Sequence, residues 1–258
     1  MLAIFKRDLI SYFTTPIGYV YMAIFLAVNG GAFSLLTLQA GADSQVSTYF
    51  TAMIFAFIVL VPILTMKVFS EEKKQKTEQL LMTSPVSLGG LVFGKFLAAY
   101  TVFAGTLLLG CINFSLLVKY GPYSTVYETV IVDGTATRVG KLVSDYNVGL
   151  LVGSVIALLL VGAAFVAIGV FVSSLTENQI VSAIATMGMM GIFLVIGMLN
   201  SYIPFAPVRE VLSWLSVYAR FGNFLNGIFD FSAVLYYASI SFVFLFLTVR
   251  IFEKRRWA

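Results

Sequence analysis

Six apolar runs, each about as long as a bilayer is thick, dominate this sequence. A membrane-spanning helix needs about 20 predominantly apolar residues. The runs lie near 17–38, 49–69, 90–118, 149–173, 178–199 and 232–251. Only 11% of the 258 residues are charged and 60% are hydrophobic, whereas about 25% of residues are charged in soluble globular domains. The pattern predicts an all-α integral membrane protein, with one membrane domain over 1–258.

A dense group of charges separates the second and third runs. Six charged side chains fall within 71–78, and each would cost at least ~2.5 kcal/mol at the bilayer centre. The segment 70–86 must therefore face water. We expect a short amphipathic helix there, supported by Glu72 and Lys76 as an i,i+4 pair and ended by Ser84-Pro85.

Three further segments are predicted to lie outside the spans. Residues 1–16 mix apolar side chains with charges, which predicts an amphipathic helix in the membrane interface. Residues 119–148 form a polar extracytoplasmic loop, in which Asp133-Gly134 fits a two-residue hairpin turn. Residues 200–231 are too polar to span and rich in aromatic side chains, so we expect an outer re-entrant segment.

The basic residues predict the orientation. With the N-terminus in the cytoplasm, eleven of the sixteen basic residues face inward, as the positive-inside rule requires. These eleven are Lys6, Arg7, Lys67, Lys73, Lys74, Lys76, Lys95, Arg250, Lys254, Arg255 and Arg256. Both termini and the charged loop are then cytoplasmic, and the expected location is a bacterial cytoplasmic membrane.

No catalytic or metal-binding set is visible in the sequence. Histidine is absent and Cys111 is the only cysteine, which removes most metal sites, disulfides and Cys–His dyads. The string 89–95 fits the start of a phosphate-binding loop, but Phe96 stands where that motif needs Ser or Thr. We reject the motif and expect Lys95 to extend toward the lipid headgroups.

Polar and small residues within the spans are expected to join helices. Asn29 is predicted to form a helix-to-helix hydrogen bond, and the glycines allow close helix approach. The glycines in question are Gly149 and Gly153, which have GxxxG spacing, and Gly162, Gly169, Gly188, Gly191 and Gly197.

Several motifs, taken together in order and spacing, resemble a known family. They are Pro16-Ile17-Gly18-Tyr19, Glu71-Glu72-Lys73-Lys74, Thr77-Glu78-Gln79-Leu80-Leu81, Ser84-Pro85, Gly94-Lys95, Phe165-Val166-Ala167-Ile168-Gly169, Ser173-Ser174-Leu175-Thr176-Glu177-Asn178-Gln179 and Glu253-Lys254-Arg255-Arg256-Trp257. The chain resembles the six-span permeases of ABC-2 transporters, which have a type V exporter-like fold. The gliding-motility-associated permease is the closest likeness, and the nitrous-oxide-reductase maturation permease is more distant. Many relatives have Gly where this chain has Lys76.

The resemblance implies a non-catalytic subunit that couples ATP hydrolysis in a separate cytoplasmic ATPase to export. It implies no cofactor on this chain, with ATP and magnesium in the ATPase. Further implied partners are a second permease copy or paralogue, the lipid bilayer and an auxiliary membrane protein with a large extracytoplasmic domain; no nucleic acid is expected.

The resemblance also assigns roles to particular residues. The charged segment becomes the coupling helix, seated on the ATPase, and the N-terminal helix touches the same subunit. The coupling residues are Glu71, Glu72, Lys73, Lys74, Lys76, Glu78 and Leu81; the interfacial helix contributes Lys6, Arg7 and Asp8; the outer re-entrant gate contains Trp214, Phe221, Phe224 and Phe229.

Two other functions stay open at this point. An ATP-driven membrane scaffold that acts mechanically on an extracytoplasmic partner would use the same charged loop. An ion-driven secondary carrier would normally carry ionisable groups near the bilayer midplane, and the apolar runs show none.

Overall fold

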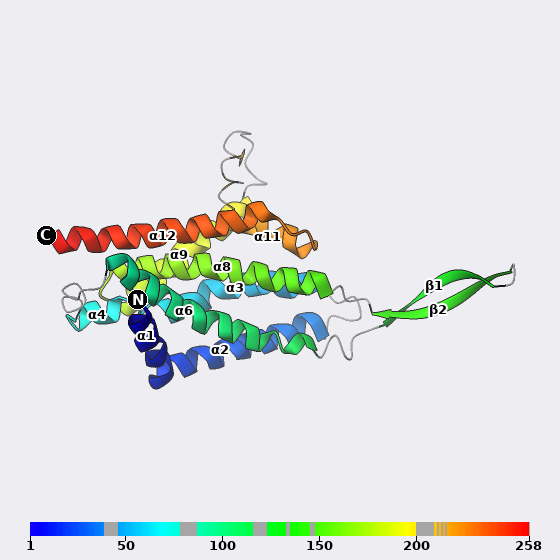
Figure 1. Cartoon of the computed structure of the whole chain (residues 1–258), viewed down its shortest axis with the longest axis horizontal. Helices are drawn as coiled ribbons and strands as arrows, with labels where there is room; N and C mark the ends of the chain where they lie inside the picture. The colour runs from blue at the N-terminus through cyan, green and yellow to red at the C-terminus, as the bar shows by residue number, and fades with distance from the viewer. Residues whose placement is uncertain are drawn as a thin grey trace.

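Long helices run side by side along the molecule, and a two-stranded hairpin extends from one end (Figure 1). The computed structural model describes residues 1–38, 46–77, 87–115, 123–132, 135–144, 148–199, 209, 210, 212, 214 and 216–257. The elements are α1 (Leu2–Thr14), α2 (Pro16–Phe33), the π-helical turn η1 (Ser34–Leu38), α3 (Val46–Thr65), α4 (Ser70–Lys74), α6 (Leu88–Gly110), β1 (Tyr123–Val132), β2 (Thr135–Ser144), α8 (Val148–Leu175), α9 (Gln179–Leu199), α11 (Val217–Leu225) and α12 (Phe231–Trp257).

Among the described residues, six stretches are long and apolar enough to cross a membrane. They are Pro16–Thr37, Ser47–Lys74, Leu88–Ser115, Gly149–Leu175, Gln179–Gly197 and Phe231–Arg256. The prediction of six spans is confirmed, and each stretch overlaps a range expected from the apolar runs. The first begins at Pro16, directly after Thr15, because the fixed φ of proline suits the first position of a helix.

The all-α prediction is confirmed for the membrane part of the chain, while one segment outside the spans forms strands. β1 and β2 pair antiparallel, with Tyr123 opposite Ser144 and Val132 opposite Thr135. This register leaves two residues between the strands, as a two-residue hairpin connection requires; those two, Asp133 and Gly134, lie outside the described residues. The strands are rich in Val, Thr and Tyr, which favour extended backbone.

α8 lies at the centre of the bundle, in contact with α3, α6, α9, α11 and α12. A Cβ atom on Gly162 would lie 2.0 Å from the Phe103 ring, and one on Gly169 would lie 2.2 Å from Thr65 Oγ1. Only glycine fits such close helix crossings. The predicted close packing is thus confirmed at Gly162, Gly169 and Gly197. It is not found at Gly153, Gly188 and Gly191, because no described atom outside the local helix lies within 4 Å of a Cβ placed there.

A buried asparagine joins helices near the hairpin end of the bundle. Asn29 Nδ2 donates to the Tyr49 hydroxyl at 2.7 Å, and Asn29 Oδ1 accepts from Asn113 Nδ2 at 3.2 Å. These bonds connect α2, α3 and the chain just after α6. The predicted helix-to-helix hydrogen bonding of Asn29 is confirmed.

Aromatic rings fill the space between α2, α3 and α6. The rings of Phe25, Phe57 and Phe103 lie with centroids 5.0 to 6.2 Å apart, and all three side chains are fully buried. Edge-to-face and stacked pairs at these distances add to the packing energy of the helices.

Candidate functional site

Lys95 of α6 is the centre of an ion cluster at the end of the bundle where α1, α4 and the C-terminal end of α12 lie (Figure 1). Its Nζ lies 2.9 Å from Asp8 Oδ2 on α1 and 2.7 Å from Glu72 Oε1 on α4. The ammonium also donates to the Val68 carbonyl oxygen at 3.1 Å. Arg7 donates through Nη2 to the same Glu72 oxygen at 3.0 Å. One cluster therefore ties together three elements that are far apart in the sequence.

The charges of this cluster are held inside the protein. The Lys95 side chain is 4% exposed, and those of Asp8 and Glu72 are 15% and 17% exposed. A buried charge is tolerated when it is paired and hydrogen-bonded. The expectation that Lys95 extends to the headgroups is wrong, because two carboxylates and a carbonyl oxygen satisfy its ammonium within the chain.

Arg7 stands at the water-facing rim of the cluster. Partial burial acts to lower the pKa of its guanidinium, but the Asp8 and Glu72 carboxylates outweigh this effect and the pKa lies above its ordinary value. Arg7 therefore keeps its charge at any physiological pH and shields the two carboxylates from each other.

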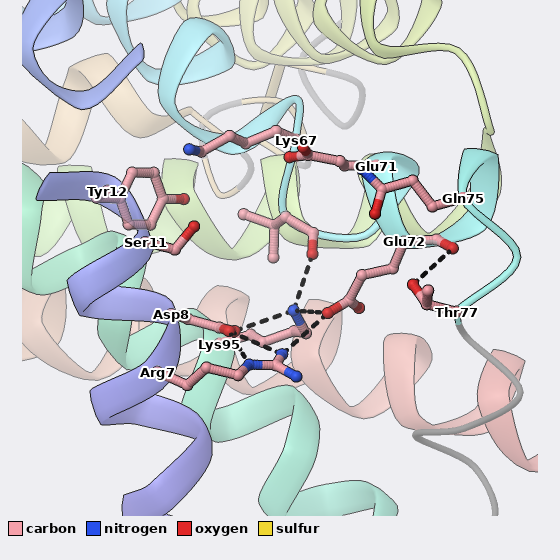
Figure 2. A pocket seen from close by; sticks show the side chains of 11 residues that line it. Arg7, Asp8, Ser11, Tyr12, Lys67, Glu71, Glu72, Gln75, Thr77 and Lys95 are labelled. Carbon is pink, nitrogen blue, oxygen red and sulfur yellow. Dashed lines mark hydrogen bonds and ion pairs between the residues drawn. The ribbon is translucent and has the colours of Figure 1, made fainter. Parts of the chain in front are cut away.

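A cavity of about 360 Å³ opens beside the cluster, between α1, α4 and α6 (Figure 2). On its wall, the Tyr12 hydroxyl donates to the Leu64 carbonyl oxygen at 3.1 Å. Burial raises the pKa of Tyr12 well above its ordinary value, so the phenol remains a neutral donor. Lys67 Nζ donates to Thr15 Oγ1 at 3.0 Å and lies 4.5 Å from the centre of the Tyr12 ring. These contacts fasten α1 to the end of α3 at a second point.

The other side of α4 is attached to the C-terminal end of α8. Ser173 Oγ accepts from two backbone N–H groups at the start of α4, at 3.0 and 3.2 Å; a helix start leaves such groups without partners in its own helix. Lys73 Nζ donates to the Ser174 carbonyl oxygen at 2.5 Å, and that oxygen also accepts from Arg255 of α12 at 3.1 Å. α4 is thus held on both faces.

The residues predicted to contact an ATPase fall into two groups. Glu72 and Lys73 point into the protein and hold α4 in place, as described above. Lys74 and Lys76 are exposed, and Glu71 is half-buried at the wall of the cavity. Lys6 on α1 is exposed at the same end, whereas Arg7 and Asp8 belong to the ion cluster. The predicted Glu78 and Leu81 lie outside the described residues.

The predicted pair of Glu72 with Lys76 is wrong. α4 ends at Lys74, and Lys76 adopts a φ of 56°, which breaks the helical spacing that an i,i+4 pair needs. Glu72 binds Arg7 and Lys95 instead. A φ in this left-handed region favours glycine, which is the residue that the family resemblance implies at position 76.

The structure does not bring the four predicted gate residues together on one surface. Phe221 and Phe224 are 0% and 1% exposed and pack within the bundle, whereas Trp214 and Phe229 are 65% and 61% exposed. Phe224 and Phe229 do touch, with ring centroids 5.7 Å apart. α11, which carries the two buried rings, lies at the end opposite α4 (Figure 1). The role of these residues in narrowing an exit path stays a prediction.

Sequence patterns did not identify three of the residues that hold α4. The sequence pattern places Lys95 at the lipid interface, and Ser173 and Ser174 stand out only as parts of a family motif. One signal for Lys95 was available: a lone lysine inside a predicted span, with Asp8 and Glu72 on the same side of the membrane. No comparable signal marks the two serines.

The ion cluster and its cavity hold helices in place. Three cations and three carboxylates line the cavity, which balances its charge. Within the described ranges, no group of three or more His, Cys, Asp or Glu side chains could hold a metal ion. The glycine-rich string 89–95 forms the first two turns of α6, capped by Ser87 Oγ, which accepts from the Gly90 N–H at 3.3 Å. It is a helix and not a phosphate-binding loop.

The model of a family described as "ABC-2 family transporter protein" matches residues 31–252, which leaves α1 and its Arg7 and Asp8 outside the matched part. A search among curated proteins finds no match. Members of this family normally pair with an ATPase subunit. The match over most of the chain, together with the six apolar helices, shows that this multi-pass membrane protein belongs to the ABC-2 family of transporter proteins.

Proposed function

We propose that the chain is the permease subunit of an ATP-binding cassette exporter, and that α4 is the element through which a separate cytoplasmic ATPase drives it. The observation that carries this proposal is the attachment of α4 on both faces. Glu72 binds Lys95 of α6 at 2.7 Å, and Lys73 binds the Ser174 carbonyl of α8 at 2.5 Å. A force applied to α4 is therefore passed directly to two spanning helices.

The outward side of α4 and the turn that follows it supply the contact surface for the ATPase. Glu71, Lys74 and Lys76 are not used by the ion cluster, and Lys6 of α1 lies at the same end. Because Asp8 and Arg7 tie α1 to the cluster, α1 and α4 move as one body with α6. Packed helices shift between discrete arrangements and do not deform continuously, so this movement changes access to the transport path.

The finer assignments follow from the resemblance. ATP and magnesium are held by the ATPase and not by this chain. A second copy or paralogue completes the permease, and an auxiliary membrane protein with a large extracytoplasmic domain meets the hairpin. The subfamily is the gliding-motility type, in a bacterial cytoplasmic membrane with both termini inside. The excess of basic residues at the α4 end supports this orientation.

The test is affinity purification of the tagged chain in mild detergent, with quantification of co-eluting ATPase and of its hydrolysis rate. The triple variant Glu71→Gln, Lys74→Gln, Lys76→Gln removes one half-buried and two exposed charges that the ion cluster does not use. It should reduce ATPase binding about tenfold, from roughly 0.5 kcal/mol for each charge. Glu72→Gln should retain the ATPase but weaken the link between its hydrolysis and the permease.

Lys254→Gln is the matched control, since Lys254 is an exposed cation at the same end, on α12. It should leave ATPase binding unchanged. A chain that elutes alone and exchanges solute in vesicles without ATP would contradict the proposal and favour the ion-driven carrier. A triple variant that binds and couples normally would remove α4 from the contact.

A further inference from the structure

An apolar groove of about 690 Å³ runs along the side of the bundle between α6, α8 and α12. Its walls include Phe93 and Tyr100 of α6, Ala163 of α8, and Ala238 and Phe242 of α12. Every lining residue belongs to one of three stretches that can cross a membrane. The groove therefore lies at the depth of the hydrocarbon, and its contents must be apolar.

The groove opens sideways, away from the bundle. Phe242 is 70% exposed, Phe246 is 46% exposed and Phe93 is 43% exposed, while the floor is formed by the half-buried Leu160 and Ala163 of α8. In a bilayer this opening faces lipid chains. A lipid can enter it without any movement of the helices.

The length of the groove matches one leaflet. Its lining runs from Gly89 to Tyr100 on α6 and from Tyr237 to Val249 on α12, which at ~1.5 Å per helical residue is about 16–18 Å. The hydrocarbon core is ~30 Å thick, so the groove covers about half of it. Gly89 and Val249 mark the end near α4, and the matching leaflet is the one on that side.

Arg250 lies at the end of the groove that is near α4. Arg250 follows the lining residue Val249, and its guanidinium lies 4.9 Å from the centre of the ring of Phe246, another lining residue. Arg250 also pairs with Glu253 at 2.6 Å, and Lys254 and Arg256 are exposed on the next turns. The local charge is therefore positive, and a guanidinium is well suited to bind phosphate oxygens.

We propose that this groove is a binding site for an anionic phospholipid, with one acyl chain lying between α6 and α12 and the phosphate held at Arg250. The lipid comes from the leaflet on the α4 side. It bridges two helices that both contact α8, and so adds to the stability of the bundle. The site does not depend on the ATPase contact proposed above.

The test is native mass spectrometry of the purified full chain, titrated with phosphatidylglycerol in detergent micelles. Ala163→Phe and Ala238→Phe place a ring in the groove and should each weaken the first phosphatidylglycerol bound by about tenfold. Arg250→Gln should weaken it about fivefold, and phosphatidylcholine should bind the wild-type chain more weakly than phosphatidylglycerol does.

Two control variants are included. Ala27→Phe adds the same ring to an exposed position of α2, and Lys74→Gln removes an exposed cation of α4, a helix that does not line the groove. Both variants should bind the lipid as the wild type does. Because Ala238 is exposed, its variant should fold, which circular dichroism checks. Equal lipid binding by Ala238→Phe and Ala27→Phe would overturn the proposal. Ala163→Phe or Ala238→Phe could instead remove a second copy of the chain from the spectrum and leave lipid binding unchanged. That result would also overturn the proposal, since a helix of the second copy would then be the occupant of the groove.

Discussion

At the scale of single residues, Lys95 has the largest expected effect. Lys95→Met would remove the buried cation that Asp8 and Glu72 share, and would leave only the half-exposed Arg7 between the two carboxylates. Removing one partner of a buried ion cluster costs about 3 kcal/mol, so the free energy of unfolding should fall by about that amount. Denaturant unfolding of the purified protein in detergent measures it.

Lys74→Met is the matched control for this prediction. Lys74 is exposed on α4, and its replacement should change the free energy of unfolding by about 0.5 kcal/mol or less. If both variants were equally stable, the ion cluster would not hold α4 to α6.

Asn29 provides a second prediction at this scale. Asn29→Leu keeps the volume of the side chain but leaves the Tyr49 hydroxyl and the Asn113 amide without their partner. Hydrogen bonds between membrane helices are worth about 1 kcal/mol, and the same unfolding measurement should show a loss of that order. Tyr49→Phe removes only one of the bonds and should cost less; a larger loss than that of Asn29→Leu would contradict this account.

At the scale of elements, close helix crossings depend on Gly162 and Gly169 of α8. Gly169→Ala would place a methyl group 2.2 Å from Thr65 Oγ1 and push α8 away from α3. Thr65 cannot easily turn aside, because it is buried and its hydroxyl donates to the Val61 carbonyl oxygen. We expect a loss of about 1–3 kcal/mol in the free energy of unfolding.

Gly153→Ala tests the same change on the same helix, where no described atom outside the local helix lies within 4 Å of the new Cβ. It should be neutral or stabilise the protein by up to about 1 kcal/mol, since alanine favours helix over glycine. Equal losses at Gly153 and Gly169 would mean that helix propensity, and not the crossing with α3, determines the cost.

At the scale of the whole molecule, the two ends should face opposite sides of the membrane. α4 lies at one end and the hairpin at the other (Figure 1). In a Cys111→Ser background, Thr137→Cys should react with a membrane-impermeant maleimide in intact cells. Lys76→Cys and Lys254→Cys should react only after permeabilisation. Labelling of Lys76→Cys in intact cells would reverse the proposed orientation.

Much of the architecture was predictable because the signals are local. Each span is a run of apolar residues that must form helix, since backbone groups in lipid have no other hydrogen-bond partners. The hairpin was predictable because β-forming residues flank Asp133-Gly134, a pair typical of two-residue turns. The ion cluster was harder to predict from the sequence. Asp8, Glu72 and Lys95 are separated by long stretches of chain, and only packing brings their charges together.

The sequence by itself determined the six helices that are long and apolar enough to cross a membrane and the likeness to the ABC-2 family. It also predicts that the charged segment faces water. The tertiary structure alone decided which helix faces pack, that α8 is central, that Lys95 points inward and that Phe221 and Phe224 are buried. The physical reason is that lipid chains are as apolar as the protein core. Hydrophobicity therefore identifies membrane helices but does not distinguish the face that meets lipid from the face that meets another helix.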